Sequence, residues 1–96
     1  MTIFAVEYVY DAESDALRNE HRPAHRAWLA SLVEGGKVLA TGPFKDGAGA
    51  LLIFAEQDEA ALNATLAQDP FADAGGISGL KVTEWQPVIG AFAHLV

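Results

Sequence analysis

Four stretches of the chain are rich in aliphatic, β-branched and aromatic residues, and each has the length of a strand. They run over Thr2 to Tyr10, Lys37 to Thr41, Ala48 to Ala55 and Gly79 to about Ile89, and this composition predicts four β-strands. The first and third are apolar at odd and even positions alike, so both of their faces should be covered, and the third should lie inside its sheet. Pro87 has no backbone N–H and predicts an edge position or a bend for the last strand.

The first helix is predicted by four apolar positions that share one face at helical spacing: Trp28, Leu29, Leu32 and Val33. Stepping back by three and four residues along this face reaches His25, which should therefore face the core. Pro23 suits the first turn of a helix and Gly35-Gly36 a stop, so we expect a helix from Pro23 to about Glu34 with His25 in its first turn. The preceding polar stretch should hold no more than a short helical turn, because Pro23 would interrupt it.

The second helix is predicted after the third strand, with Asp58 as its N-cap. Its apolar face comprises Ala61, Leu62, Thr65 and Leu66. Continuing this face reaches Asp69, immediately before the helix-stopping Pro70. We therefore expect Asp69 at the C-terminal end of the helix, where the helix dipole disfavours its charge by about 0.3 to 1 kcal/mol and a compensating partner is needed. The segment from Phe71 to Gly76 is expected to form a loop.

The order β-α-β-β-α-β in 96 residues predicts a single domain, 1–96, with a ferredoxin-like α+β fold. Such a fold has a four-stranded antiparallel sheet with both helices on one face. Its topology brings His25, Asp69 and the hairpin from Gly42-Pro43 to Gly47 to the same edge. Because two strands are apolar on both faces and the helices cover only one, we also expect a homodimer that buries the other face.

The charge and composition of the chain narrow its range of partners. Its formal charge of -7, with only six lysines and arginines, leaves no basic cluster for nucleic acid or for an anionic membrane surface. The chain has no cysteine, its three histidines lack the spacing of a metal site, and no glycine motif suits a phosphate. We therefore expect no metal and no cofactor. The absence of a signal segment or a long apolar run favours a cytoplasmic protein.

His25 and Asp69 are the candidate catalytic residues. An imidazole oriented by a carboxylate is the usual arrangement of a general base, because the acid fixes the tautomer and stabilises the protonated ring. Each residue also has a purely structural interpretation: a backbone carbonyl can satisfy a core histidine, and an aspartate before proline is common in turns. No serine or threonine stands out as a nucleophile.

Four groups of residues resemble the pattern of the YciI-like, or YCII-related, protein family: Arg22-Pro-Ala-His25, Gly35 to Gly42-Pro43, Asp69-Pro70-Phe71 and Trp85-Gln-Pro87. The resemblance covers nearly the whole chain. It implies a ferredoxin-like fold, dimers of the α+β barrel type, and an active site at His25 and Asp69. The wider superfamily includes small-molecule isomerases, dehalogenating enzymes and monooxygenases that act on ring compounds. The segment from Phe44 to Gly47 is shorter than in many members, which leaves the lid of the pocket and the size of the substrate open.

Two main hypotheses for the function follow, with a purely structural dimer as a third. The first is a cofactor-independent enzyme of isomerase, lyase, dehalogenase or hydrolase type, whose His25-Asp69 dyad moves protons in a pocket at the edge of the dimer barrel. Its small-molecule substrate would contact Arg22, Arg26, Trp28, Gly42, Pro43, Phe44 and Phe71, with the arginines holding an anionic or enolic group. The second is a module that binds a small metabolite in the same pocket without turnover. A His-Asp pair is a capacity to move protons and does not distinguish the two.

Overall fold

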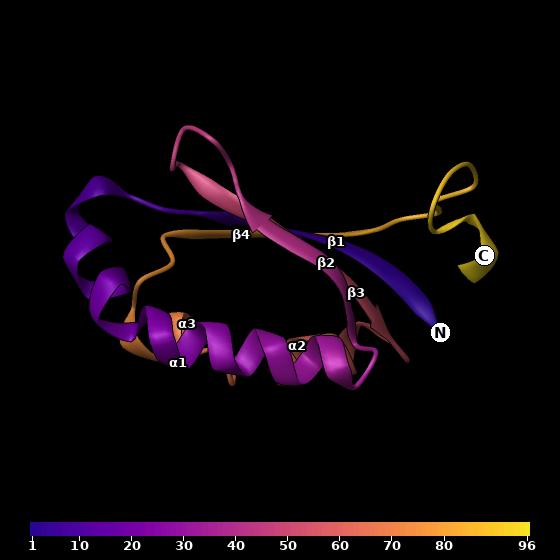
Figure 1. Cartoon of the computed structure of the whole chain (residues 1–96), viewed down its shortest axis with the longest axis horizontal. Coiled ribbons are helices and arrows are strands. Elements are labelled where there is room, and N and C mark those ends of the chain that lie inside the picture. The colour runs from indigo at the N-terminus through magenta and orange to yellow at the C-terminus, as the bar shows by residue number, and fades with distance from the viewer.

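The chain folds into two layers, a β-sheet and a layer of helices. In the computed structural model, which describes residues 1–96, the elements are β1 (Thr2–Val9), η1 (Ala12–Ser14), α1 (Asp15–Glu34), β2 (Val38–Pro43), β3 (Gly49–Glu56), α2 (Glu59–Leu66), α3 (Pro70–Ala74), β4 (Gly79–Glu84) and η2 (Ala93–Leu95). The four strands form one antiparallel sheet in the order β2-β3-β1-β4. The α-helices all lie on one side of it (Figure 1). The predicted ferredoxin-like α+β fold is confirmed.

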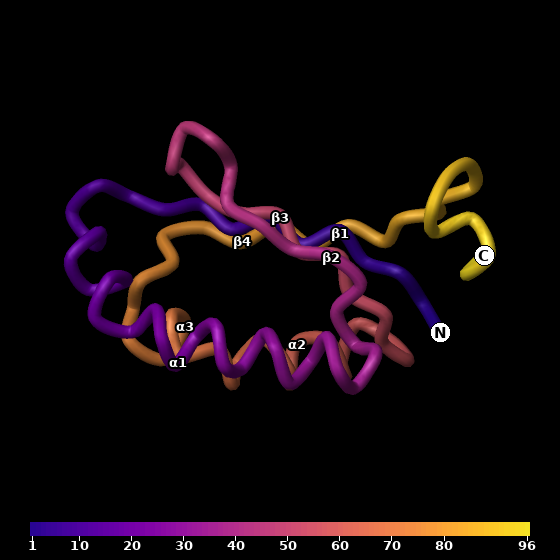
Figure 2. Tube along the Cα trace, in the orientation of Figure 1, coloured from indigo at the N-terminus to yellow at the C-terminus, as the bar shows by residue number.

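The alternation of side chains along the central strands builds the core. On β1, Phe4, Val6 and Tyr8 pack with Leu52 and Phe54 of β3 on the face that the helices cover. As predicted, the doubly apolar β3 lies inside the sheet and β4 lies at its edge. The tube in Figure 2 shows that both chain termini lie at the same end of the sheet.

Helix α1 is longer than the sequence pattern predicts. It begins at Asp15, so Pro23 lies inside the helix and the predicted first-turn position of His25 is wrong. The added turns are held by Arg18, whose buried guanidinium donates hydrogen bonds to the carbonyl oxygens of Gly76, at 2.9 Å, and Asp11, at 2.8 Å. These contacts offset the backbone hydrogen bond that Pro23 cannot make.

The second helical region is divided into two helices. Helix α2 begins as predicted, with the Asp58 carboxylate accepting a hydrogen bond from the Ala61 N–H at 2.8 Å, but it ends at Leu66. Asp69 is the N-cap of α3 and accepts a hydrogen bond from the Phe71 N–H. A carboxylate is favoured at the positive end of a helix dipole. The predicted C-terminal position of Asp69, its electrostatic penalty and the predicted loop after it are therefore wrong.

The other face of the sheet is open over its middle. At one end, Leu95 of η2 packs against Ile3, Ile53 and Ala55. The segment after β4 rises above this end of the sheet, and the loop between β2 and β3 rises above the other (Figure 1). Between them the side chain of Leu51 on the central strand β3 remains 37% exposed. The middle of the open face thus carries exposed apolar side chains beside the charged residues Glu7 and Lys81, and two projections border it.

Candidate functional site

His25 and Asp69 are in contact in the layer between α1 and the sheet. The Nδ1 atom of His25 lies 2.7 Å from Oδ1 of Asp69, although 44 residues separate them along the chain. His25 is 8% exposed, and Asp69 is fully buried at 0%. Burying a carboxylate is costly unless hydrogen bonds replace its hydration, and the imidazole supplies one of them.

Two further donors complete the surroundings of the Asp69 carboxylate. The Tyr8 hydroxyl donates a hydrogen bond to Oδ2 at 2.7 Å, and the Phe71 N–H donates one to Oδ1 at 2.9 Å. Three donors from β1, α1 and α3 match the acceptor-only chemistry of a carboxylate. Tyr8 was not among the candidate residues predicted from the sequence. Its position could have indicated this role, because Tyr8 shares one face of β1 with apolar residues, and a hydroxyl buried on that face requires a hydrogen-bond partner.

The two tyrosines near Asp69 stay protonated at neutral pH. Burial raises the pKa of the Tyr8 phenol far above its ordinary value, and the charge of Asp69 and its hydrogen bond act in the same direction. Burial, followed by the charge of Asp69, also raises the pKa of Tyr10, while Arg18 and Arg22 oppose the shift. Tyr8 is therefore a permanent hydrogen-bond donor to Asp69 rather than a group that exchanges protons.

The contacts of His25 assign its tautomer. Because an ionised carboxylate has no proton to donate, Nδ1 of the ring carries the hydrogen that binds Asp69. The other ring nitrogen, Nε2, has no partner within the chain and is not shut off from solvent. A neutral His25 in this tautomer can accept a proton at Nε2, and the imidazolium that forms is stabilised by the carboxylate on its far side.

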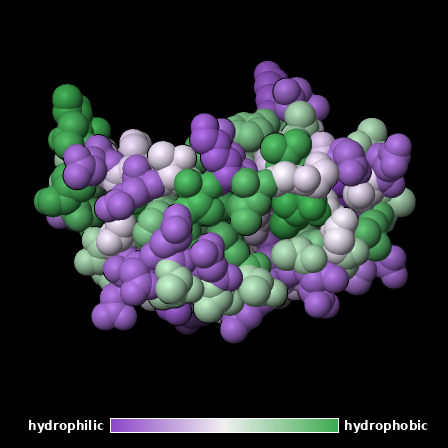
Figure 3. Space-filling model, turned by 180° about the vertical axis from the view of Figure 1, so that it is seen from behind, coloured by the Kyte–Doolittle hydropathy of each residue, from purple (hydrophilic) through white to green (hydrophobic).

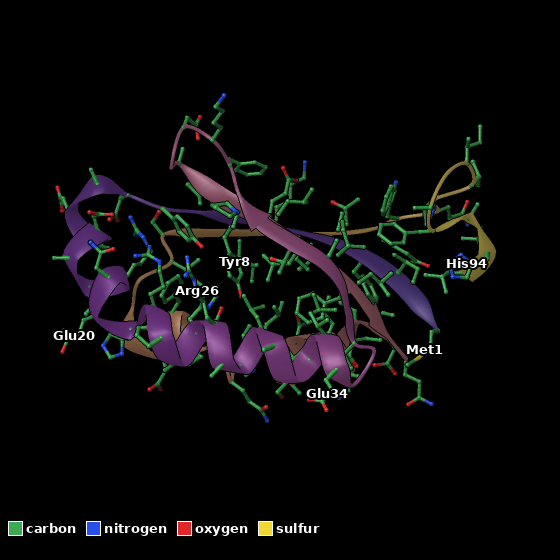
Figure 4. The ribbon with its side chains drawn as sticks, in the orientation of Figure 1. Met1, Tyr8, Glu20, Arg26, Glu34 and His94 are labelled. Atoms are coloured by element: carbon green, nitrogen blue, oxygen red, sulfur yellow. The ribbon has the colours of Figure 1, made fainter.

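His25 lines a hollow of about 290 Å³ between α1 and the β2–β3 side of the sheet, here termed the His25 pocket. Its lining residues are Tyr10, Arg22, His25, Arg26, Leu29, Thr41, Gly42, Pro43, Ala50 and Phe71. The predicted meeting of His25, Gly42 and Pro43 at one edge is thus observed. In Figure 4, Tyr8 and Arg26 lie at the same end of the layer between the sheet and α1. The volume is at the lower end of the range for small-molecule pockets, about 300 to 1,000 Å³.

Two arginines give the His25 pocket a positive rim in a chain of formal charge -7. Arg26 is exposed and Arg22 is half-buried, both on the same helix as His25. The Arg22 guanidinium bonds to the Asn19 side chain and lies 5.8 Å from the centre of the Phe71 ring. Guanidinium groups suit carboxylate, phenolate or enolate oxygens. The rim therefore matches a small anionic ligand.

Two residues predicted to contact the substrate lie outside the His25 pocket. Phe44 follows Pro43, and the alternation of the strand turns it to the open face, where it lines a separate hollow with Leu51 and Ile53. Trp28 packs against the core, with its ring 6.1 Å from that of His25, and its buried Nε1 has no hydrogen-bond partner. Both placements correct the prediction. Conversely, the pocket contains Tyr10, Leu29, Thr41 and Ala50, which the sequence analysis did not select.

A second hollow, of about 340 Å³, lies beside the start of β4. It is lined by Tyr8, Leu66, Ala72, Ile77, Ser78, Gly79 and Leu80. Figure 3 shows the molecule from behind, with apolar side chains gathered over the middle of that face. The second hollow contains neither His25 nor the two arginines, so the groups able to move a proton or bind an anion face the His25 pocket.

The chain contains no group of three or more His, Cys, Asp and Glu side chains arranged to hold a metal ion. None of its helices combines the length and the apolar character needed to cross a bilayer.

Comparisons with known proteins agree with this fold. The model of the YCII-related domain matches residues 3–86. The 5-chloro-2-hydroxyhydroquinone dehydrochlorinase from Burkholderia phenoliruptrix AC1100, solved in complex with 2,5-dihydroxybenzoquinone, is 25% identical, with a TM-score of 0.77 over 86% of this chain and 92% of its own. An antibiotic biosynthesis monooxygenase is 18% identical, with a TM-score of 0.56 over 88% of this chain and 96% of its own, and shares the fold. No curated protein matches the sequence.

Proposed function

Because this chain belongs to the YCII-related domain family, we propose that it is a small-molecule enzyme in which His25 and Asp69 perform general acid/base chemistry without a cofactor. The observation that carries the proposal is the 2.7 Å contact between Nδ1 of His25 and the buried Asp69 carboxylate, which leaves Nε2 open beside the His25 pocket. The similarity to a dehydrochlorinase that binds a dihydroxybenzoquinone supports a substrate of the same general kind, a small ring compound with acidic hydroxyl groups.

The proposed reaction begins with transfer of a proton from the substrate to Nε2 of His25. The electron pair left on the substrate forms an enolate or phenolate, whose negative charge is held by Arg22 and Arg26 at the rim. The Asp69 carboxylate accepts the hydrogen bond from Nδ1 and stabilises the imidazolium, while Tyr8 keeps its own proton and holds the carboxylate in place. In a second step the imidazolium returns its proton to another substrate atom, or to a leaving group as it departs. Isomerases, lyases and dehalogenases of this type share these steps, whereas in a hydrolase His25 would take the first proton from the attacking water molecule.

The test is turnover of a panel of chlorinated hydroquinones, enols and lactones by the unmodified protein, His25→Asn and Asp69→Asn. Loss of a general acid/base group lowers the rate by about 10² to 10⁴-fold, so we expect His25→Asn to fall within that range and Asp69→Asn to lose a large part of the activity. His94→Asn is the matched control, because His94 is an exposed histidine in η2, and it should retain full activity.

The same panel distinguishes the alternative of a metabolite-binding module. Binding of a ring compound that depends on Arg22 and Arg26, without turnover of any compound, would reject the enzyme and favour the module. Turnover that His25→Asn leaves unchanged would reject the assigned base.

We also propose that the chain forms a homodimer through the open face of the sheet. Leu51 and Phe44 are 37% and 39% exposed on this face, and the two projections at its ends would border a second sheet packed against it. Light scattering after size exclusion should give twice the chain mass of 10.2 kDa. Leu51→Lys should shift the mass to that of a monomer, because it places a charge in the interface. A monomer at micromolar concentration in the unmodified protein would contradict the proposal.

A further inference from the structure

The ring of Phe71 covers one face of the His25 imidazole. The two ring centres are 3.8 Å apart and the planes differ by only 4°, whereas the nearby Trp28 ring is 6.1 Å away and tilted by 31°. Phe71 is 2% exposed. Its contact with His25 is therefore a close parallel stack, shielded from water.

Two contacts hold the Phe71 ring in this position, and a third supports it through Tyr10. Its own N–H is bound to Oδ1 of Asp69, the same oxygen that binds His25, so one carboxylate sets the places of both residues. The edge of the Tyr10 ring meets Phe71 at 6.1 Å and 82°. Arg18, which also ties α1 to the loop before β4, lies 4.3 Å over the Tyr10 ring. The stack is built by residues from three separate segments, namely α1, the segment just after β1 and the start of α3, and does not depend on one flexible side chain.

We propose that Phe71 is a positioning residue that fixes the plane of the His25 ring and favours its protonated form. The face of an aromatic ring carries partial negative charge and attracts a cation placed over it. A neutral imidazole gains little from this contact, and an imidazolium gains more. The inference rests on the proposed role of His25 as the base, because it describes how that base holds the proton it receives.

The charged and titratable groups around His25 act together with the Phe71 ring. They are Asp69 before α3, Arg22 and Arg26 on α1, and Tyr8 and Tyr10 on β1 and just beyond it. Asp69 favours the imidazolium and the two arginines oppose it. The Phe71 ring contributes in the same direction as Asp69 but carries no formal charge, so its effect should change little with salt.

The experiment is an NMR titration of the three histidines, with the His25 signals assigned by their loss in His25→Asn. In Phe71→Leu, which keeps an apolar side chain of similar size but has no aromatic face, the titration midpoint of His25 should fall by about half a pH unit. Phe71→Tyr, which keeps the ring, should restore the original midpoint. The midpoints of His21 and His94 should stay constant in every variant.

A second variant keeps the test decisive if Phe71→Leu does not fold. Pentafluorophenylalanine at position 71 preserves the shape of the ring and reverses the charge of its face, so it should lower the His25 midpoint at least as far as Phe71→Leu. Unchanged midpoints in the folded variants would overturn the proposal. The titration needs no substrate, so a failure to find turnover and a failure of the Phe71 inference are separate results.

Discussion

Residues 15–24 and residues 25–34 form one continuous helix, α1, but they contact the rest of the protein in different ways. The second half lies on the core through an apolar face, with Trp28, Leu29 and Leu32 packed against it. The first half has one buried side chain, that of Arg18, and is held mainly by polar contacts of its guanidinium. Its interior also contains Pro23, which weakens the helix.

The difference between the two halves explains the position of the candidate site. His25 lies where they meet, next to Arg22 and Arg26, so the helix changes from polar to apolar contacts at the pocket. An apolar face places the His25 ring against Phe71 and Asp69, and the two arginines at the rim lie on either side of the junction, Arg22 in the polar half and Arg26 in the apolar half. Three substitutions along α1 distinguish the apolar packing of the second half from the polar contacts of the first half by their effects on stability.

The largest effect is expected from Trp28→Ala in the apolar half. Truncating a tryptophan packed on the core costs about 3 kcal/mol, near the lower end of the usual range because Trp28 is half-buried. Urea unfolding followed by circular dichroism measures the change. Val33→Ala, at a position 51% exposed in the same half, is the control and should cost less than about 1 kcal/mol. Equal effects of the two variants would contradict the packing described for this half.

Arg18→Met in the polar half should cost about 2 kcal/mol. Methionine fills a similar space, but the carbonyl oxygens of Gly76 and Asp11 lose their buried donors. Hydrogen exchange should then speed up in residues 15–22 before it does in residues 25–34. Asp15→Asn is the control, since the Asp15 side chain is 67% exposed and its 3.9 Å ion pair with Arg18 should be worth little. A uniform increase in exchange along α1 would show that Arg18 does not hold the first half separately.

Pro23→Ala should produce the smallest change, and in the opposite direction. Alanine restores the backbone N–H that proline lacks and propagates a helix well, which should stabilise the protein by about 1 kcal/mol after the added freedom of the unfolded chain is subtracted. The same urea titration measures it, and turnover should be unaffected because Pro23 does not line the His25 pocket. A loss of stability would mean that the proline ring makes contacts that matter more than the missing hydrogen bond.

Much of the architecture could be predicted from local pattern. The four strands, the inner position of β3, the N-cap at Asp58 and the apolar half of α1 all follow from residues close together in the chain. Their physical causes, which are alternation, helical spacing and capping, act over a few residues and are therefore visible in the sequence. The pairing of His25 with Asp69 was also predicted from such patterns, because each is a polar residue at a position that continues the apolar face of a helix.

The remaining features were decided by contacts between distant parts of the chain. The first half of α1 exists because Arg18 reaches Gly76, 58 residues away. Asp69 is held by Tyr8, at a separation of 61 residues, and it caps a helix whose existence the pattern before Pro70 did not indicate. Local propensity contributes tenths of a kcal/mol per residue, whereas a buried donor or acceptor left without a partner costs about 1 to 3 kcal/mol. These larger energies depend on which segments meet in space, so only the tertiary structure determined them.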